Sequence, residues 1–133
     1  MTKAFLIVTG VLWLGYGIYL LIAPQELAGI AGVAATSTTG TVELRAMYGG
    51  LQAAVGVLAL WAGVSAAWRT QGLTALLFLY SGMGLVRLAS AAVTHEFSTY
   101  VIGALCFELP SALIAWALLR REVRPDLLRG MNR

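Results

Sequence analysis

The chain alternates between long apolar stretches and short polar ones, and this pattern predicts its main elements. Four stretches are each about as long as the roughly 20 apolar residues that a helix needs to cross a membrane. The segments between them are short and leave no room for a separate soluble domain. The predicted helices cover residues 4–22, 43–64, 73–93 and 97–119, with an outer loop at 23–42 and a basic tail at 120–133. The sequence therefore predicts one all-α domain over residues 1–133, a polytopic membrane protein built as a four-transmembrane-helix bundle.

The first apolar stretch and the loop after it allow a finer interpretation. Because Lys3 precedes an apolar run, a signal peptide is an alternative for residues 4–22, but we expect a membrane helix there. Pro24 is suited to open a short interfacial helix, since its missing N–H costs nothing at an early helical position. Residues 34–41 are rich in Ser, Thr and Gly and predict a loop, with Thr41 as the N-cap of the second membrane helix.

Lysine and arginine residues gather on one side of the predicted helices. The opposite loops, residues 23–42 and 94–98, contain neither residue type. Loops rich in Lys and Arg stay preferentially in the cytoplasm, so we expect both termini on the cytoplasmic side. The basic residues on that side are Lys3, Arg69, Arg120, Arg121, Arg124, Arg129 and Arg133.

Composition indicates that lipid is the surrounding solvent. The chain is 59% hydrophobic and 11% charged, whereas soluble domains have about 25% charged residues. A soluble domain of this size leaves much of its surface in water and could not hide so many apolar side chains. The net charge of +3 is explained by topology, so we expect membrane lipids rather than nucleic acid as partners of the basic tail.

Glycines recur every seven residues on the first two predicted helices. Small residues at this spacing allow two helix backbones to approach closely in lipid, where packing must replace the hydrophobic effect. We therefore expect these positions to be helix contacts in a left-handed bundle. They are Gly10 and Gly17 on the first helix and Gly49, Gly56 and Gly63 on the second.

Charged side chains interrupt the third and fourth apolar stretches. A charge in the bilayer core costs about 2.5–3.5 kcal/mol on insertion scales, so such residues normally face the protein interior and pair with other groups. Further polar side chains approach the same depth from the second helix, where Arg45, Tyr48 and Gln52 follow the i, i+3, i+7 spacing of one helix face. The predicted buried polar cluster, a possible ligand site, comprises Glu43, Arg45, Tyr48, Gln52, Tyr80, Arg87 and Glu108.

Each charged position also has a purely structural interpretation. Glu43 is equally explained as a first-turn acid that the helix dipole favours, and Arg45 as a side chain that extends to the outer headgroups. Arg87 and Glu108 form either an ion pair that fixes helix register or a ligand or proton site. His95 lies in the outer loop, where we expect solvent exposure rather than metal ligation.

Motifs of known chemistry are missing from the sequence. It contains no G-x-x-x-x-G-K-[ST] phosphate loop and no G-x-S-x-G nucleophile motif. The single cysteine, Cys106, excludes an intramolecular disulfide. We therefore expect no metal, no cofactor and no catalytic residue.

One run of residues resembles the signature of a known family. Residues 43–51, Glu-Leu-Arg-Ala-Met-Tyr-Gly-Gly-Leu, followed by Gly56, are similar to small bacterial membrane proteins catalogued as domain of unknown function 4345. The isolated Arg87 and Glu108 fit the same pattern. The resemblance covers nearly the whole chain and is strongest in that run. It implies a four-helix protein of the bacterial inner (plasma) membrane and carries no established activity.

Three functions are compatible with these features. We favour an accessory or interaction subunit, in a larger membrane complex or a homo-oligomer, because the helices carry glycine faces and the loops are short. The alternative is a binding protein for a lipophilic small molecule, such as a quinone, sterol or hydrocarbon, held by the buried polar cluster. A membrane isomerase that uses Glu108 as acid or base beside Arg87 is less favoured, since one acid is thin support for catalysis.

Overall fold

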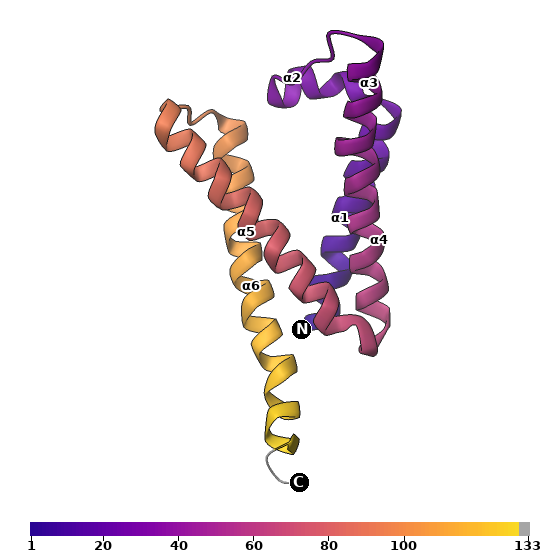
Figure 1. Ribbon diagram of the computed structural model, residues 1–133, viewed down its shortest axis with the longest axis vertical. Coiled ribbons are helices and arrows are strands. Elements are labelled where there is room, and N and C mark those ends of the chain that lie inside the picture. Colours follow the sequence, from indigo (N-terminus) through magenta and orange to yellow (C-terminus); the bar gives the residue numbers. More distant parts are fainter. Residues whose placement is uncertain (131–133) are drawn as a thin grey trace. The chain divides into compact units, whose positions relative to one another are not determined.

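The part of the chain that the structure describes is helical and contains four long apolar helices (Figure 1). The computed structural model describes residues 1–130, and its account of side chains ends at Val123. Four stretches are long and apolar enough to span a membrane, which confirms the predicted number and order. These stretches are Thr2–Ile22, Thr38–Val64, Ala66–Thr94 and Thr99–Val123.

Residues Lys3–Val64 form one compact unit. In it, α1 (Thr2–Ile22) packs against α4 (Leu51–Val64). A Cβ added to Gly10 would lie 2.7 Å from Leu60 Cγ, and one added to Gly63 would lie 2.8 Å from Ile7 Cδ1. Because early residues of α1 meet late residues of α4, the two helices run antiparallel.

The seven-residue glycine pattern lies along this contact. A Cβ at Gly56 would lie 2.7 Å from Leu14 Cα, one at Gly17 would lie 2.8 Å from Ala53 Cα, and one at Gly49 would lie 2.9 Å from the Leu21 amide nitrogen. Real Cβ atoms essentially never come so close to backbone atoms. The missing side chains therefore set how near α1 and the second long helix approach each other.

The outer loop contains the short helix predicted at Pro24. Pro24 occupies the first position of the 3₁₀ turn η1 (Pro24–Glu26), and α2 (Leu27–Ala31) follows directly. Gly32 ends α2 with φ 69°, a left-handed conformation that glycine adopts at little cost. Leu20, Leu27 and Leu44 form a buried apolar cluster that holds this segment against the long helices of the unit.

The second long helix begins earlier than the sequence predicted. Its first part, α3 (Thr38–Leu44), is capped by Ser37, whose side chain accepts a hydrogen bond from the Gly40 amide at 3.0 Å. The prediction of Thr41 as N-cap is therefore wrong. A serine hydroxyl caps a helix as well as a threonine hydroxyl does, and the Ser-Thr-Gly composition of the first turn resembles that of a loop.

A π-helical segment, η2 (Arg45–Gly50), interrupts this helix before α4 begins. The Leu51 amide donates to the Ala46 carbonyl, five residues back, which widens the helix and rotates the residues that follow. The spacing that placed Arg45, Tyr48 and Gln52 on one face assumes a regular α-helix, so it does not apply across η2. Arg45 is exposed, whereas Tyr48 and Gln52 are half-buried.

Residues Ser65–Arg133, together with Met1 and Thr2, form the second unit. A 3₁₀ turn, η3 (Ala66–Trp68), leads into α5 (Arg69–Thr94), which packs along α6 (Thr99–Gly130). Helix α5 ends at His95, whose φ of 56° is left-handed and whose amide donates to the Ala91 carbonyl. Helix α6 continues into the predicted basic tail, and the tail's side chains beyond Val123 lie outside the described residues.

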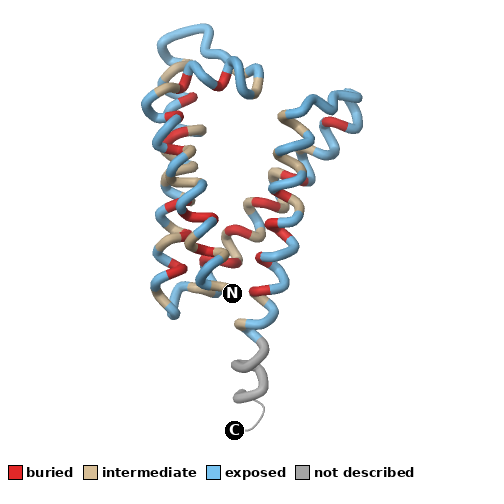
Figure 2. Tube along the Cα trace, turned by 180° about the vertical axis from the view of Figure 1, so that it is seen from behind, coloured by how far each residue is buried: buried red, intermediate tan, exposed pale blue. Residues whose placement is uncertain are grey.

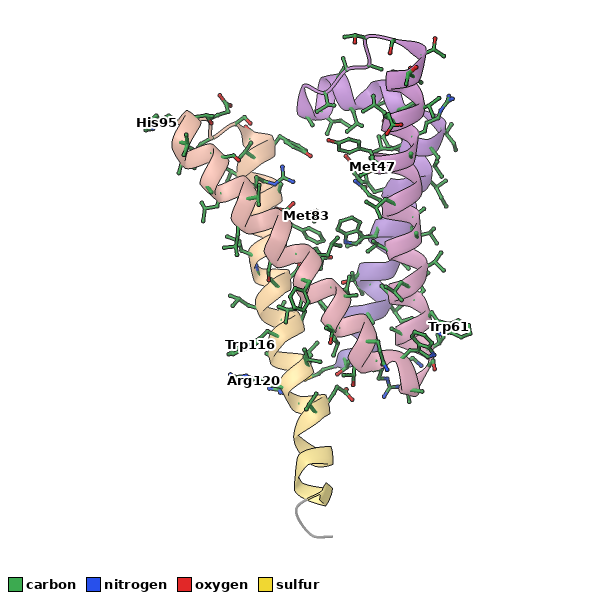
Figure 3. All side chains as sticks on the ribbon, in the orientation of Figure 1. Met47, Trp61, Met83, His95, Trp116 and Arg120 are labelled. Carbon is green, nitrogen blue, oxygen red and sulfur yellow. The ribbon has the colours of Figure 1, made fainter. Side chains whose placement is uncertain are left out.

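Apolar side chains cover much of the outside of these helices. In each candidate membrane span only a minor part of an apolar 18-residue window is buried inside the chain, from 22% in Ala66–Thr94 to 33% in Thr99–Val123. Figure 2 shows exposed positions along each long helix, and Trp61 projects away from α4 with 56% of its surface exposed (Figure 3). Apolar exposure on this scale marks a surface that contacts lipid or another protein.

Candidate functional site

A charged pair joins α5 to α6 within the second unit. The Nε atom of Arg87 donates to both carboxylate oxygens of Glu108, at 3.2 and 3.0 Å, and Nη2 donates to Oε1 at 2.8 Å. The Glu108 side chain is 5% exposed and that of Arg87 is 28% exposed. Forked contacts between a guanidinium and a carboxylate are among the strongest side-chain hydrogen bonds. The structure thus brings these two predicted residues into direct contact.

A glycine one turn earlier on α5 lies against α6 beside this contact. A Cβ on Gly84 would lie 2.8 Å from Leu109 Cδ2 and 3.4 Å from Glu108 Cβ, so a larger residue would require the Leu109 side chain to move. Arg87 lies seven residues before the end of α5 at Thr94, which corresponds to about 10 Å along the helix. The pair therefore lies well inside the apolar part of the hairpin.

One aromatic ring contacts the charged pair, and two others pack together between the same helices. The Tyr100 ring centroid lies 5.7 Å from the Arg87 Cζ atom, within the range of a cation–π interaction. Tyr80 is fully buried and packs edge-on against Phe107, with 5.5 Å between ring centroids and 83° between ring planes. The cluster predicted from the sequence does not include Tyr100. Its place on α6, about two turns before Glu108, is the signal that could have identified it.

The predicted cluster is divided between the two units. Tyr80, Arg87 and Glu108 belong to the second unit, and the other four residues belong to the first. Glu43 is exposed near the end of α3, and because the helix begins at Thr38, its interpretation as a first-turn acid is wrong. The convergence of the two groups into one site stays a prediction.

Gln52 is the most unusual polar residue of the first unit. Its Oε1 atom is buried and makes no hydrogen bond among the described residues. Buried amide oxygens normally have a donor partner. The residue lies two positions after the end of η2, and π-helical turns inside α-helices occur frequently at functional sites. Gln52 therefore stays in the set of candidate ligand contacts, as the sequence predicted.

The arrangement around Glu108 limits the chemistry that it offers. Both carboxylate oxygens accept bonds from Arg87, while the Nη1 atom of Arg87 takes no part in these bonds. Tyr100 is a further side-chain hydrogen-bond partner of the guanidinium, so the site presents the remaining guanidinium N–H donors more readily than a free carboxylate. Within residues 1–123, no group of three or more His, Cys, Asp or Glu side chains lies close enough to hold a metal ion.

Comparison with known proteins identifies the family that this sequence matches. The model of the family described as Domain of unknown function (DUF4345) matches residues 1–119, which confirms the resemblance inferred from residues 43–51. Neither the search of curated proteins nor the search of solved structures found a match.

Proposed function

The chain belongs to the family described as Domain of unknown function (DUF4345), and on that basis we propose that it works as an interaction subunit in a membrane assembly. It lies in a bacterial inner (plasma) membrane, crosses it four times and keeps both termini in the cytoplasm. Four long apolar helices support the crossings, and the one-sided distribution of Lys and Arg supports the orientation. The partner is either another membrane protein or a second copy of the chain.

Glycines without neighbours carry this proposal. Gly15 in α1, Gly82 in α5 and Gly103 in α6 each have open space where a Cβ would be, with nothing within 4 Å. A glycine inside a helix costs about 0.5–1 kcal/mol relative to alanine. At Gly56 close packing against α1 offsets that cost, and at these three positions no described residue of the same unit does so. Small residues on a membrane helix allow the close approach of another helix, so each of these positions supports contact with a partner helix.

The charged pair supports the same proposal. Arg87 and Glu108 satisfy each other and tie α5 to α6. A rigid hairpin with exposed small residues is suited to present one fixed surface to a partner helix. A structural ion pair accounts for the two costly charges in these apolar helices without a catalytic role. Charges within lipid are tolerated when they are paired.

The test compares how much partner is recovered with the parent protein and with variants that carry a large side chain at these glycines. Tagged protein, extracted from its own membrane in mild detergent, should carry a partner at a fixed ratio. Gly82→Leu and Gly103→Leu should lower partner recovery roughly tenfold or more, because overpacking costs about 1–3 kcal/mol. Their thermal stability in the isolated chain should equal that of the parent, since each side chain enters open space.

Ala92→Leu is the matched control. Ala92 is also exposed on α5 but lies about 80° around the helix from Gly82 at 100° per residue. The Ala92→Leu variant should retain the partner. A parent protein that leaves the membrane as a lone monomer contradicts the proposal, and so does unchanged partner recovery with both glycine variants.

A further inference from the structure

An open groove lies beside the charged pair, within the second unit. Its volume is about 420 Å³, in the range of about 300–1,000 Å³ that is usual for small-molecule sites. Its α5 lining extends from Met83 to Thr94, and Val101 contributes from α6. The eleven helical steps from residue 83 to residue 94 correspond to about 16 Å. The groove is therefore elongated along α5 and suited to a ligand of similar shape.

The groove is apolar at one end and polar at the other. Met83 and Val86 line the end nearer the middle of α5, while Thr94 and Glu96 line the end at the outer loop. Arg87 lies between the two ends. Methionine adapts its shape to apolar ligands, so the inner end is suited to a hydrocarbon chain. The order of these residues indicates an amphiphile with its polar group near Arg87.

The polar groups next to the apolar end are hydrogen-bond donors. A guanidinium has five N–H groups; the bonds from Arg87 to Glu108 use the Nε and Nη2 atoms, and Tyr100 is a further side-chain hydrogen-bond partner, which together leave N–H groups for a ligand. The Ser90 hydroxyl lies one turn further along the groove and is exposed. The Thr94 hydroxyl donates to the Ser90 carbonyl at 2.9 Å, so its proton is already engaged. A ligand with acceptor oxygens complements this set.

The charges around the groove disfavour a charged ligand. Arg87 and Glu108 are neutral as a pair, and Glu96 adds a negative charge at the outer end. An anionic group would meet the Glu96 carboxylate and a guanidinium whose charge Glu108 already neutralises, whereas a cationic group would meet the guanidinium. An unpaired charge in an apolar environment is also costly in itself. An uncharged ligand avoids each of these costs.

We infer that this groove binds an uncharged lipid whose polar end carries carbonyl oxygens. A carbonyl oxygen accepts a hydrogen bond from Arg87, and the hydrocarbon chain lies along Met83 and Val86. Quinones and diacylglycerols share this chemistry, and the test separates them. The inference goes beyond the proposed interaction function and is independent of it, because binding to the isolated chain requires no partner.

The experiment measures thermal unfolding of the purified chain in lipid nanodiscs with four added probes. Decylubiquinone and dioctanoylglycerol carry carbonyl groups, hexadecane carries no polar group, and palmitate is anionic. A ligand that binds only the folded state raises the melting temperature. At saturation we expect a rise of about 5 °C with at least one of the two carbonyl probes, and none with hexadecane or palmitate.

Variants locate the binding site. Ser90→Trp and Val86→Trp place an indole in the groove at exposed positions, so both should fold and lose the ligand-induced rise. Ala89→Trp is the matched control, because Ala89 is exposed on α5 and does not line the groove. It should keep the full rise. Each variant is compared with its own melting temperature without ligand.

The result for each probe decides the inference. A rise with decylubiquinone alone identifies a quinone, and a rise with dioctanoylglycerol alone identifies an acylglycerol. No rise with either carbonyl probe overturns the inference. Equal rises in the parent and both groove variants overturn it as well, because binding then lies elsewhere. A rise with palmitate or hexadecane that matches the carbonyl probes refutes recognition of an uncharged carbonyl group.

Discussion

Arg87 and Glu108 differ in exposure, and at the residue scale this difference decides how each responds to loss of the other. Glu108 is 5% exposed and Arg87 is 28% exposed. A carboxylate without its partner stays buried and charged, whereas a guanidinium on a long apolar stem can turn toward the membrane interface. The two single substitutions should therefore have unequal costs.

A double-mutant cycle measures this asymmetry. Arg87→Leu should lower the free energy of unfolding by about 3–5 kcal/mol, as expected when a buried pair loses one partner. Glu108→Leu should cost less. The double variant should recover much of the loss, which gives a large coupling energy in denaturant unfolding in detergent. Additive losses would show that the two side chains do not interact.

The sequence predicted the existence of this pair better than its surroundings. Two charges in adjacent apolar stretches need partners, whatever the exact packing. Arg87 and Glu108 were therefore identifiable from their positions within those stretches of the sequence. The contact of Tyr100 with Arg87 depends on how α6 is rotated against α5. The apolar stretches do not encode that rotation, because lipid accepts any face of a hydrophobic helix.

At the element scale, glycines set the distance between α1 and the second long helix. A Cβ at Gly56 would lie 2.7 Å from Leu14 Cα, while one at Gly15 would meet nothing within 4 Å. Both residues lie within long helices of the same unit. Replacing each of them by leucine therefore makes the same chemical change in two opposite packing environments.

Gly56→Leu should destabilise the isolated chain by about 3 kcal/mol, the upper part of the range for overpacking, because backbone must move to admit the side chain. Gly15→Leu should leave stability unchanged or improve it, since leucine favours a helix more than glycine does. Thermal unfolding in detergent measures both. Equal melting temperatures for parent and Gly56→Leu would rule out the close crossing.

The long helices could be predicted from the sequence, but the π-helical segment within the second one could not. Their existence follows from the length of the apolar stretches, which local composition determines. The η2 segment (Arg45–Gly50) requires one extra residue in a turn, and helical periodicity alone gives no sign of it. The Gly49-Gly50 pair is a local feature that permits such a turn, because glycine tolerates altered backbone angles.

At the scale of the whole molecule, both proposals require that the chain lie in a membrane. Large apolar side chains such as Phe78 and Val93 are 74% and 80% exposed, which water would not tolerate over so many residues. The four crossings that we propose would place the two termini on the same side. The distribution of basic residues then decides which side that is.

Cysteine labelling of intact cells tests this central claim most directly. In a Cys106→Ser background, single cysteines replace Ser37, Ser98 or Thr70, all of which are exposed in the structure. The account predicts that Ser37→Cys and Ser98→Cys react with a membrane-impermeant thiol reagent outside the cytoplasm, and that Thr70→Cys reacts only after the membrane is broken. Labelling of Thr70→Cys in intact cells, or protection of Ser37→Cys, would contradict the four-span topology with cytoplasmic termini.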